Sequence, residues 1–190
     1  MILPIVAIGN PVLKQVAKDI TPDYPELKQL IQDMFETMEN AKGVGLAAPQ
    51  IGKSIRLFIV DASPFADEED ENHEFLKDFR KVFINPKIVE ENGEPWNFEE
   101  GCLSIPGIRE EVERKEEISI EYYDENFKFH KEKFDDIVCR VIQHEYDHIE
   151  GILFTDHLNP LKKRLLKKKL ANISIGDVKV NYKMKFNTKK

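Results

Sequence analysis

The chain has 190 residues, of which 41% are hydrophobic and 33% charged, and its formal net charge is −7. That length fits one folded domain with a sizeable core, and no apolar run approaches the roughly 20 residues that a membrane-spanning helix needs. The two cysteines, Cys102 and Cys139, are too few for a disulfide framework, so a small disulfide-stapled secreted protein is excluded and a reducing cytoplasm is expected.

The first third of the chain predicts a helix and a buried strand. The N-terminal segment is apolar but has no basic region, and the Gly-Asn-Pro sequence at residues 9–11 interrupts it too early for a signal peptide. Residues 25–41 place apolar side chains at helical spacing, and Gly43 ends this pattern. Residues 55–60 (IRLFIV) indicate a buried strand.

The middle of the chain begins with an acidic segment and continues with sequence patterns that are typical of strands. Residues 64–78 carry a run of acidic side chains, which predicts a solvated surface loop. Residues 82–90 and 111–123 alternate between apolar and polar side chains, and residues 124–126 (DEN) fit a turn. We therefore expect antiparallel strands in this region.

The last third predicts two more helices, over residues 134–150 and 160–170, and an exposed strand or tail over residues 179–186. Helices separated by antiparallel-looking strands favour an α+β fold over a doubly wound one. The sequence shows neither an internal repeat nor a domain boundary. We expect a single domain over residues 1–190, with strands packed around a central helix, a C-terminal helix, and residues 171–190 as an extended tail.

The helix expected over residues 134–150 contains the pattern His-Glu-x-x-His, with His144, Glu145 and His148 at its defined positions. A spacing of four residues puts both imidazoles on one helix face, where they can bind one metal ion. Glu145 can reach a water beside that metal, which makes it a candidate general base for metal-assisted hydrolysis. The alternative is an ordinary helix with two solvent-facing histidines, but neighbouring apolar residues favour a buried helix: Val138, Val141, Ile142 and Leu153.

A catalytic zinc-type site needs a third protein ligand and one open position. One class of metallopeptidases uses a downstream glutamate, but no glutamate follows Glu150. Another class continues the pattern with a glycine, here Gly151, and a third histidine, but that last position holds Phe154. His157 lies three residues too late. This second class is disfavoured and remains the alternative interpretation.

The two cysteines differ as candidates for the third ligand. Cys139 lies five residues before His144, which is about 140° around a helix, so it faces away from the metal and fits a small buried residue. Cys102 follows Gly101 and precedes a short apolar run, so the backbone can approach closely there. These residues by themselves leave open whether Cys102 is a ligand.

Three separate segments resemble the three signature motifs of the peptide deformylases. They are residues 43–52 (GVGLAAPQIG), 100–104 (EGCLS) and 143–148 (QHEYDH). Their order and rough spacing are also similar, and residues 8–13 (IGNPVL) look like the usual start of the family. The resemblance extends from near residue 2 to about residue 161, and three motifs together are far more specific than any one of them.

The resemblance implies an enzyme that removes the formyl group from N-formylmethionine at the start of newly made proteins. It implies Cys102, His144 and His148 as metal ligands, with Fe²⁺ as the metal in the cell and Zn²⁺, Ni²⁺ or Co²⁺ as substitutes. The residue types agree in part, because one thiolate and two imidazoles suit Zn²⁺ or Fe²⁺ and not Mg²⁺ or Ca²⁺. Residue types alone do not choose between zinc and iron.

The same resemblance implies roles for three further groups. Glu145 takes a proton from the attacking water and later gives one to the departing amine. The side-chain amide of Gln50 and the backbone N–H of Leu103 stabilise the negative charge on the formyl oxygen. The alternative for Gln50 is an ordinary polar loop residue after Pro49.

The peptide substrate is expected to bind beside Gly43, Val44 and Gly45, because glycines expose backbone groups that an extended chain can pair with. By resemblance, residues near the second and third motifs line the pocket for the methionine side chain: Glu100, Arg109, Arg140, Val141 and His144. Arg140 departs from the apolar residue that the family often has. It either faces the pocket or extends to solvent.

The C-terminal end of the chain is strongly basic. Eleven lysine and arginine residues and one acidic residue, Asp177, lie between Leu161 and Lys190. Residues 161–170 form a basic amphipathic pattern, which fits either a helix with a solvated lysine face or a helix that docks to ribosomal RNA. By resemblance, a C-terminal helix has the second role. We expect neither a membrane nor a DNA partner.

Two other classes of function compete with the deformylase. A different His-Glu-x-x-His metallopeptidase would cleave internal peptide bonds and would have no use for Gln50. A non-enzymatic protein with a structural metal site would close all four coordination positions with protein ligands and would not need Glu145.

Overall fold

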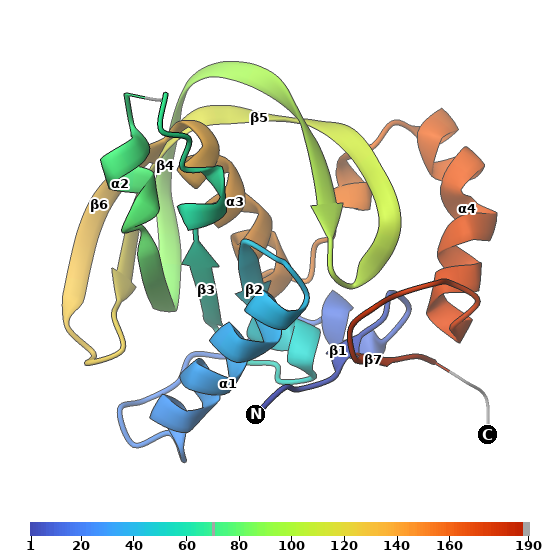
Figure 1. The fold of residues 1–190 in the computed structure, drawn as a ribbon, viewed down its shortest axis with the longest axis horizontal. Coiled ribbons are helices and arrows are strands. Elements are labelled where there is room, and N and C mark those ends of the chain that lie inside the picture. The colour runs from blue at the N-terminus through green and yellow to red at the C-terminus, as the bar shows by residue number, and fades with distance from the viewer. Residues whose placement is uncertain (70, 188–190) are drawn as a thin grey trace.

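The computed structural model describes residues 1–69 and 71–187, and it confirms the α+β fold (Figure 1). One antiparallel sheet has the order β2–β3–β4–β5–β6, with β2 (Gly45–Ala47), β3 (Leu57–Asp61), β4 (Arg80–Cys102), β5 (Ile105–Tyr123) and β6 (Phe129–Asp135). A two-stranded parallel sheet contains β1 (Ile5–Val6) and β7 (Met184–Lys185). The helices are α1 (Leu27–Asn40), α2 (His73–Lys77), α3 (Asp136–Ile149) and α4 (Pro160–Ile175), with short 3-10 helices η1 (Pro11–Lys14), η2 (Ala48–Ile51), η3 (Ser63–Phe65) and η4 (Phe154–His157).

Strand β3 is buried on both faces, which explains its continuous apolar sequence. Side chains alternate along a strand, so Phe58 and Val60 join the hydrophobic cluster of α3, while Leu57 and Ile59 join the cluster of α1. The central helix α3 contributes Val138, Cys139, Val141, Ile142 and Ile149 to its cluster, and α1 contributes Leu30, Ile31, Met34, Phe35 and Met38 to the other. The helix with the His-Glu-x-x-His motif is therefore largely buried inside the molecule.

The two longest strands, β4 and β5, form a hairpin that arches over α3 (Figure 1). Cys102 pairs with Ile105, so only Leu103 and Ser104 connect the two strands. This tight connection lies beside α3, because Cys102 is within hydrogen-bonding range of His148. The hairpin thus brings the second sequence motif to the third.

The strands predicted over residues 82–90 and 111–123 are correct in type but much too short. Strand β4 runs on from Glu90 to Cys102 although Gly93 and Pro95 normally indicate a turn. Register shifts in this part of the hairpin, one of them between Asn92 and Pro95, accommodate these residues without ending the strand.

Other differences from the sequence predictions concern polar segments. The acidic loop predicted over residues 64–78 contains the short helix α2. Strand β6 was not predicted, because only Phe134 among its residues is buried and its charged side chains conceal the alternation. Helix α4 extends five residues beyond the predicted end at residue 170, and the predicted strand over residues 179–186 contracts to the two residues of β7. Within the described ranges, no helix is both long and apolar enough to cross a bilayer.

Candidate metal centre and active site

Cys102, His144 and His148 each offer one ligand atom, and these atoms all lie within 4.8 Å of one another. Cys102 ends β4 and the two histidines lie one turn apart on α3. The sulfur of Cys102 is 3.3 Å from Nε2 of His148. Burial holds the pKa of His148 well below its usual value, so its imidazole is neutral, as metal binding requires. Burial alone would lower the pKa of His144, but hydrogen bonds to Cys102 and Glu100 hold it well above its usual value, so a metal bound there would displace a proton. One thiolate and two imidazoles at this spacing fit a single Zn²⁺ or Fe²⁺ ion.

Gln50 lies beside this cluster on η2 and is only 1% exposed. Its Oε1 accepts a hydrogen bond from the backbone N–H of Ala47 at 2.9 Å. That bond fixes the amide, so the NH₂ group faces the Cys102 sulfur at 3.5 Å and the Ser104 hydroxyl at 3.4 Å. The structure therefore presents an oriented amide donor at the candidate metal centre, and Gln50 is not an ordinary loop residue.

Glu145 is 4% exposed, and its Oε2 has no hydrogen-bond partner within the described part of the chain. Burial raises the pKa of Glu145 to about 7, and the positive charge of His144 limits the rise. A Cβ at Gly45 would lie 2.4 Å from Oε1 of Glu145, so only glycine leaves room for this carboxylate. A buried carboxylate oxygen without a hydrogen-bond partner costs free energy, and such a group is often found at a functional site.

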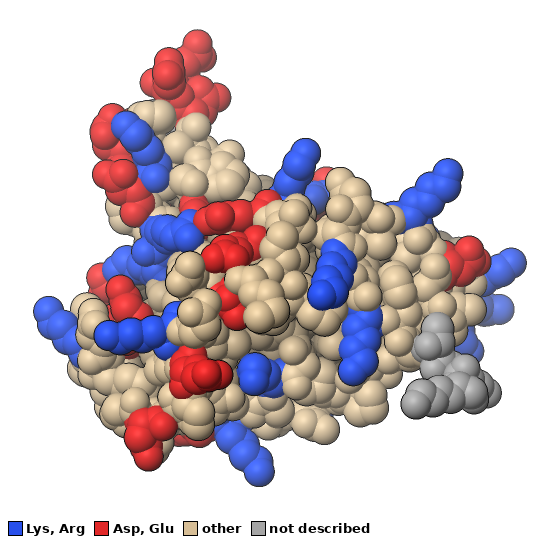
Figure 2. All heavy atoms as spheres, turned by 60° about the horizontal axis from the view of Figure 1, so that its bottom comes forward, with Lys and Arg blue, Asp and Glu red and all other residues tan. Residues whose placement is uncertain are grey.

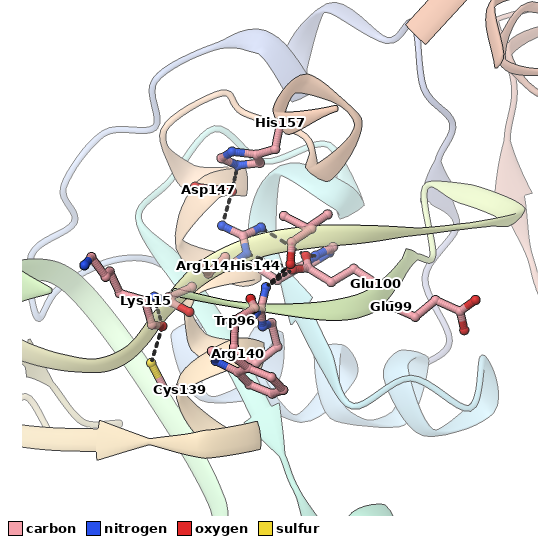
Figure 3. Close-up of polar contacts among 12 residues, drawn as sticks. Trp96, Glu99, Glu100, Arg114, Lys115, Cys139, Arg140, His144, Asp147 and His157 are labelled. Carbon is pink, nitrogen blue, oxygen red and sulfur yellow. Dashed lines mark hydrogen bonds and ion pairs between the residues drawn. The ribbon is translucent and has the colours of Figure 1, made fainter. Parts of the chain in front are cut away.

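Glu100 is also buried, but four donors surround its carboxylate (Figure 3). Nδ1 of His144 lies 2.8 Å from Oε1, which leaves Nε2 of that ring for a metal. Arg114 binds both oxygens, through Nε at 2.8 Å and Nη2 at 3.0 Å, and Nη1 of Arg140 lies 2.9 Å from Oε2. Burial alone would raise the pKa of Glu100, but the hydrogen bonds from His144 and Arg114 hold it well below its usual range. Glu100 fixes the ring of His144, and it also lines the pocket in which the sequence predicts a contact with substrate.

Arg140 does not extend to solvent, because it is only 2% exposed. Besides Glu100, it donates to the carbonyl oxygens of Val112 at 2.8 Å and Trp96 at 2.7 Å. Its guanidinium carbon also lies 4.5 Å from the centre of the Trp96 ring (Figure 3). Arg140 therefore clamps the β4–β5 hairpin to α3 while it lines the pocket beside the candidate metal centre.

The remaining polar residues of the motif region lie behind the site. Asp147 accepts hydrogen bonds from Nη1 of Arg114 at 2.8 Å and from His157 at 2.7 Å. His157 is thus engaged away from the metal ligands, in agreement with its exclusion as a third ligand. Cys139 is fully buried, and burial raises the pKa of its thiol to about 12, so it is not a thiolate.

A pocket of about 530 Å³ opens onto the three candidate ligands. Its lining includes the residues that the sequence assigned to substrate binding: Gly43, Val44, Gly45, Glu100, Arg109 and Val141. Strand β2 begins at Gly45 and lies at the edge of the sheet, with β3 as its partner. Its other edge can therefore pair with an extended peptide, as a free sheet edge does.

Two features of the site were missed by the sequence interpretation. Arg114 supports Glu100 and Asp147, but nothing in its local pattern distinguishes it from other arginines of a charged strand. The segment Lys179–Tyr182 also lines the pocket, although it lies far from every motif in the sequence. Its alternating tyrosine and valine side chains were the available signal that it packs against the domain.

Comparisons with known proteins agree with this geometry. The family model described as polypeptide deformylase matches residues 2–164. The chain is 61% identical over 194 residues to a peptide deformylase from Christiangramia forsetii, covering 100% of this chain and 99% of the relative. It is 58% identical over 189 residues to a peptide deformylase from Flavobacterium johnsoniae, covering 98% and 96% respectively.

Solved structures show the same fold. The peptide deformylase from Legionella pneumophila has a TM-score of 0.77 and 37% identity, covering 90% of this chain and 95% of that chain. The peptide deformylase from Thermotoga maritima has a TM-score of 0.74 and 37% identity, covering 84% of this chain and 99% of that chain. The resemblance therefore holds for the sequence motifs and for the whole fold.

Proposed function

The chain belongs to the polypeptide deformylase family, and we propose that Cys102, His144 and His148 hold the catalytic metal of this deformylase. It is a hydrolase that removes the N-formyl group from nascent proteins. The convergence of one thiolate and two imidazoles within 4.8 Å is the observation that supports this ligand set. The alternative of a different metallopeptidase is not favoured.

A divalent metal bound here would lower the pKa of a water and polarise the formyl carbonyl. Glu145 is placed to take the proton from that water and to deliver a proton to the departing amine. A pKa near the working pH suits both steps, and burial raises the pKa of Glu145 to about 7. The burial of Glu145 on α3 thus brings its pKa close to the pH at which it would exchange the proton.

The formyl oxygen gains negative charge as the carbon becomes tetrahedral, and we assign its stabilisation to Gln50 and Leu103. The Gln50 amide is held in one orientation by Ala47 and points its NH₂ group at the ligand cluster. Leu103 follows the metal ligand Cys102 directly, so its backbone N–H lies next to the site. Loss of one such donor costs about 10²–10³ in rate.

The peptide binds along the free edge of β2. Val44 and the glycines on either side of it line the pocket and supply backbone groups for pairing. Val141 and Arg140 lie in the same pocket and would contact the methionine side chain. A peptide bound in this way would have its formyl group at the metal and the rest of its chain directed out of the pocket.

The ligand set is tested by replacing each cysteine in turn. Cys102→Ala is expected to lose bound metal and to release no formate from a formyl-methionyl tripeptide. Cys139→Ala is the matched control, because that thiol is buried away from the site and donates at 3.9 Å to the Lys115 carbonyl. A Cys102→Ala variant that keeps stoichiometric metal and full activity would refute the assignment.

We propose Fe²⁺ as the metal in the cell, with Zn²⁺, Ni²⁺ or Co²⁺ able to substitute. The donor set suits all of these ions. Metal analysis after anaerobic purification from cells, together with loss of activity on exposure to air, tests this assignment. Activity that survives air in a protein purified with zinc would contradict it.

We also propose that α4 contacts the ribosome. Its first turns leave Leu161 66% and Leu165 72% exposed, so they do not anchor the helix, which packs instead through Leu166, Leu170 and Ile173. Within the described residues, no acidic partner is found for four basic side chains: Lys163, Arg164, Lys167 and Lys168. Figure 2 shows acidic side chains mainly over the left of one face, whereas the charged side chains on the right, the side on which α4 lies in Figure 1, are mainly basic. Association with ribosomes should weaken steeply with salt and with reversal of these charges.

A cytoplasmic location follows from the nascent chains that are its substrates. The thiols of Cys102 and Cys139 are both free, as is usual in a reducing compartment. Fractionation of cells that express the protein at its natural level would test this location.

A further inference from the structure

The C-terminal strap, defined here as residues 177–187, returns from α4 to the active-site side of the molecule (Figure 1). It begins after Gly176, whose φ of 90° ends α4. Strand β7 pairs in parallel with β1, and Asn187 donates a hydrogen bond to the Ile8 carbonyl at 2.9 Å. The strap is thus fixed to the domain. It lies outside residues 2–164, the part of the chain that the family model matches.

The middle of the strap forms part of the pocket wall. Lys179, Val180, Asn181 and Tyr182 line the same pocket as Cys102. No role for these residues follows from the catalytic motifs. Because both ends of the strap are anchored, this wall is built into the fold and does not depend on a bound peptide.

Tyr182 connects the strap to the catalytic connection between β4 and β5. Its hydroxyl donates to the carbonyl oxygen of Leu103 at 2.7 Å. Burial raises the pKa of Tyr182, so the hydroxyl remains a donor at all physiological pH values. The Ile8 N–H binds the next carbonyl, that of Ser104, at 2.9 Å. Two residues that flank the small β1–β7 sheet, Tyr182 and Ile8, therefore hold the two residues that follow the ligand Cys102.

The rim of the pocket carries uncompensated positive charge. Three exposed basic residues line it, namely Lys42, Arg109 and Lys179. Arg109 is paired with Glu99 at 3.1 Å, and no acidic partner is found for the two lysines within residues 1–69 and 71–187. This local excess contrasts with the net charge of −7 for the whole chain.

We propose that the C-terminal strap is a specificity-determining wall of the peptide groove. Lys179 and Lys42 favour peptides with an acidic side chain after the formylmethionine, and Tyr182 is a positioning residue that holds Leu103 at the formyl group. The proposal rests on the assignment of this pocket to the substrate. It concerns the part of the peptide that lies beyond the reacting group.

The charge preference is tested with three C-terminally amidated peptides, formyl-Met-Ala-Glu, formyl-Met-Ala-Gln and formyl-Met-Ala-Lys. At low salt we expect kcat/KM to be about three- to tenfold higher for the Glu peptide than for the Lys peptide, because solvent-exposed charge pairs act weakly. Lys179→Glu should reduce or reverse this ratio. Lys183→Glu is the matched control, since Lys183 belongs to the same strap and does not line the pocket.

The possible results distinguish a failure of the strap proposal from a failure of the proposed function. Formate release from all three peptides at one rate, or an equal effect of Lys183→Glu and Lys179→Glu, would overturn the specificity of the strap and leave the deformylase intact. No formate from any peptide would overturn the assignment of the pocket itself. A ratio that persists unchanged at 1 M salt would also contradict an electrostatic origin, because charges on the rim are screened there.

The positioning role is tested by Tyr182→Phe, which removes the hydroxyl and keeps the ring. We expect kcat to fall about three- to tenfold with little change in KM, because Leu103 acts on the reacting oxygen and not on the bound peptide chain. Tyr123→Phe is the control, since Tyr123 packs against the same hydrophobic cluster and no hydrogen bond of its hydroxyl is found among the described residues. An unchanged kcat in folded Tyr182→Phe, or an equal loss in the control, would overturn this role.

Discussion

The two buried glutamates on either side of His144 differ in what surrounds their carboxylates. Glu100 lies on the hairpin side, where His144, Arg114 and Arg140 compensate its charge. Glu145 lies on the β2 side, where its Oε2 has no partner within the described part of the chain. The pKa of Glu100 is consequently held low and that of Glu145 is raised to about 7.

This difference shows how one residue type serves two purposes within one site. A compensated carboxylate stays ionised and can fix the ring of a metal ligand in position. An uncompensated carboxylate is costly to ionise, so it can exchange a proton near neutral pH. The hairpin side of His144 is therefore built for support, and the β2 side is built for chemistry.

The largest expected effect is the loss of the base in Glu145→Gln. We expect kcat/KM to fall by about 10²–10⁴, because the amide is nearly isosteric but cannot accept the proton. Metal content, measured in the same preparation, should stay unchanged. Glu100→Gln should lose metal as well as activity, so a Glu145→Gln variant that also loses its metal would contradict the division between the two sides.

The next effect concerns stability on the hairpin side. Glu100→Gln leaves the guanidinium groups of Arg114 and Arg140 buried without their common counter-charge. Breaking a buried ion pair in this way costs about 3–5 kcal/mol of unfolding free energy. Loss of the partner of a metal-bound histidine should also weaken metal affinity about 10–100-fold. Chemical denaturation and metal titration measure these two effects, and an unchanged midpoint with unchanged affinity would rule out the supporting role.

A smaller effect is expected when one cation of the cluster is removed. Arg140→Met keeps the long apolar stem, and Arg114 and His144 still compensate Glu100. Nε of Arg140 has no hydrogen-bond partner within the described residues, so the native arrangement is not fully satisfied. We expect a loss of about 1–3 kcal/mol by denaturation. A loss as large as that of Glu100→Gln would show that the hairpin depends on Arg140 and not on the shared carboxylate.

The sequence singled out the residues that we propose for the chemistry, whereas it did not single out Arg114, which supports them. The spacing of His144 and His148 is enough to place both candidate ligands on one helix face, because the period of a helix is fixed. The local pattern alone did not decide whether Cys102 is a ligand. Only the resemblance to the family motif implied this role, and the hairpin pairing with Ile105 that brings Cys102 to α3 is not visible in the sequence. Arg114 and Tyr182 could not be found, because their roles depend on contacts between residues distant in the chain.

The dependence on contacts between distant residues also explains which elements of the fold were predicted from the sequence. Helices α1, α3 and α4 and strand β3 follow from local periodicity, and they were predicted with errors of up to five residues at their ends. The extended part of β4 after Glu90 and the polar strand β6 are stabilised by pairing with β5, which no local pattern records. Tertiary pairing overrides propensity in strands more readily than in helices.

The smallest expected effect is on the pH dependence of stability, to which Glu145 and Glu100 should contribute with opposite sign. The pKa of Glu145 rises from 4.5, its ordinary value, to about 7 in the folded protein. The folded state therefore binds this proton more tightly than the unfolded state, so the contribution of Glu145 to stability is fully present below pH 4.5 and is lost as the pH rises through 7. Glu100 has the opposite sign, because its pKa is lowered on folding, and its contribution is present above pH 4.5 and lost on acidification. In metal-stripped protein, Glu145→Gln should therefore gain about 1–2 kcal/mol relative to the wild type between pH 5 and pH 8. Denaturation at several pH values measures this difference, and a gain independent of pH would mean that the buried carboxylate is already compensated by a partner.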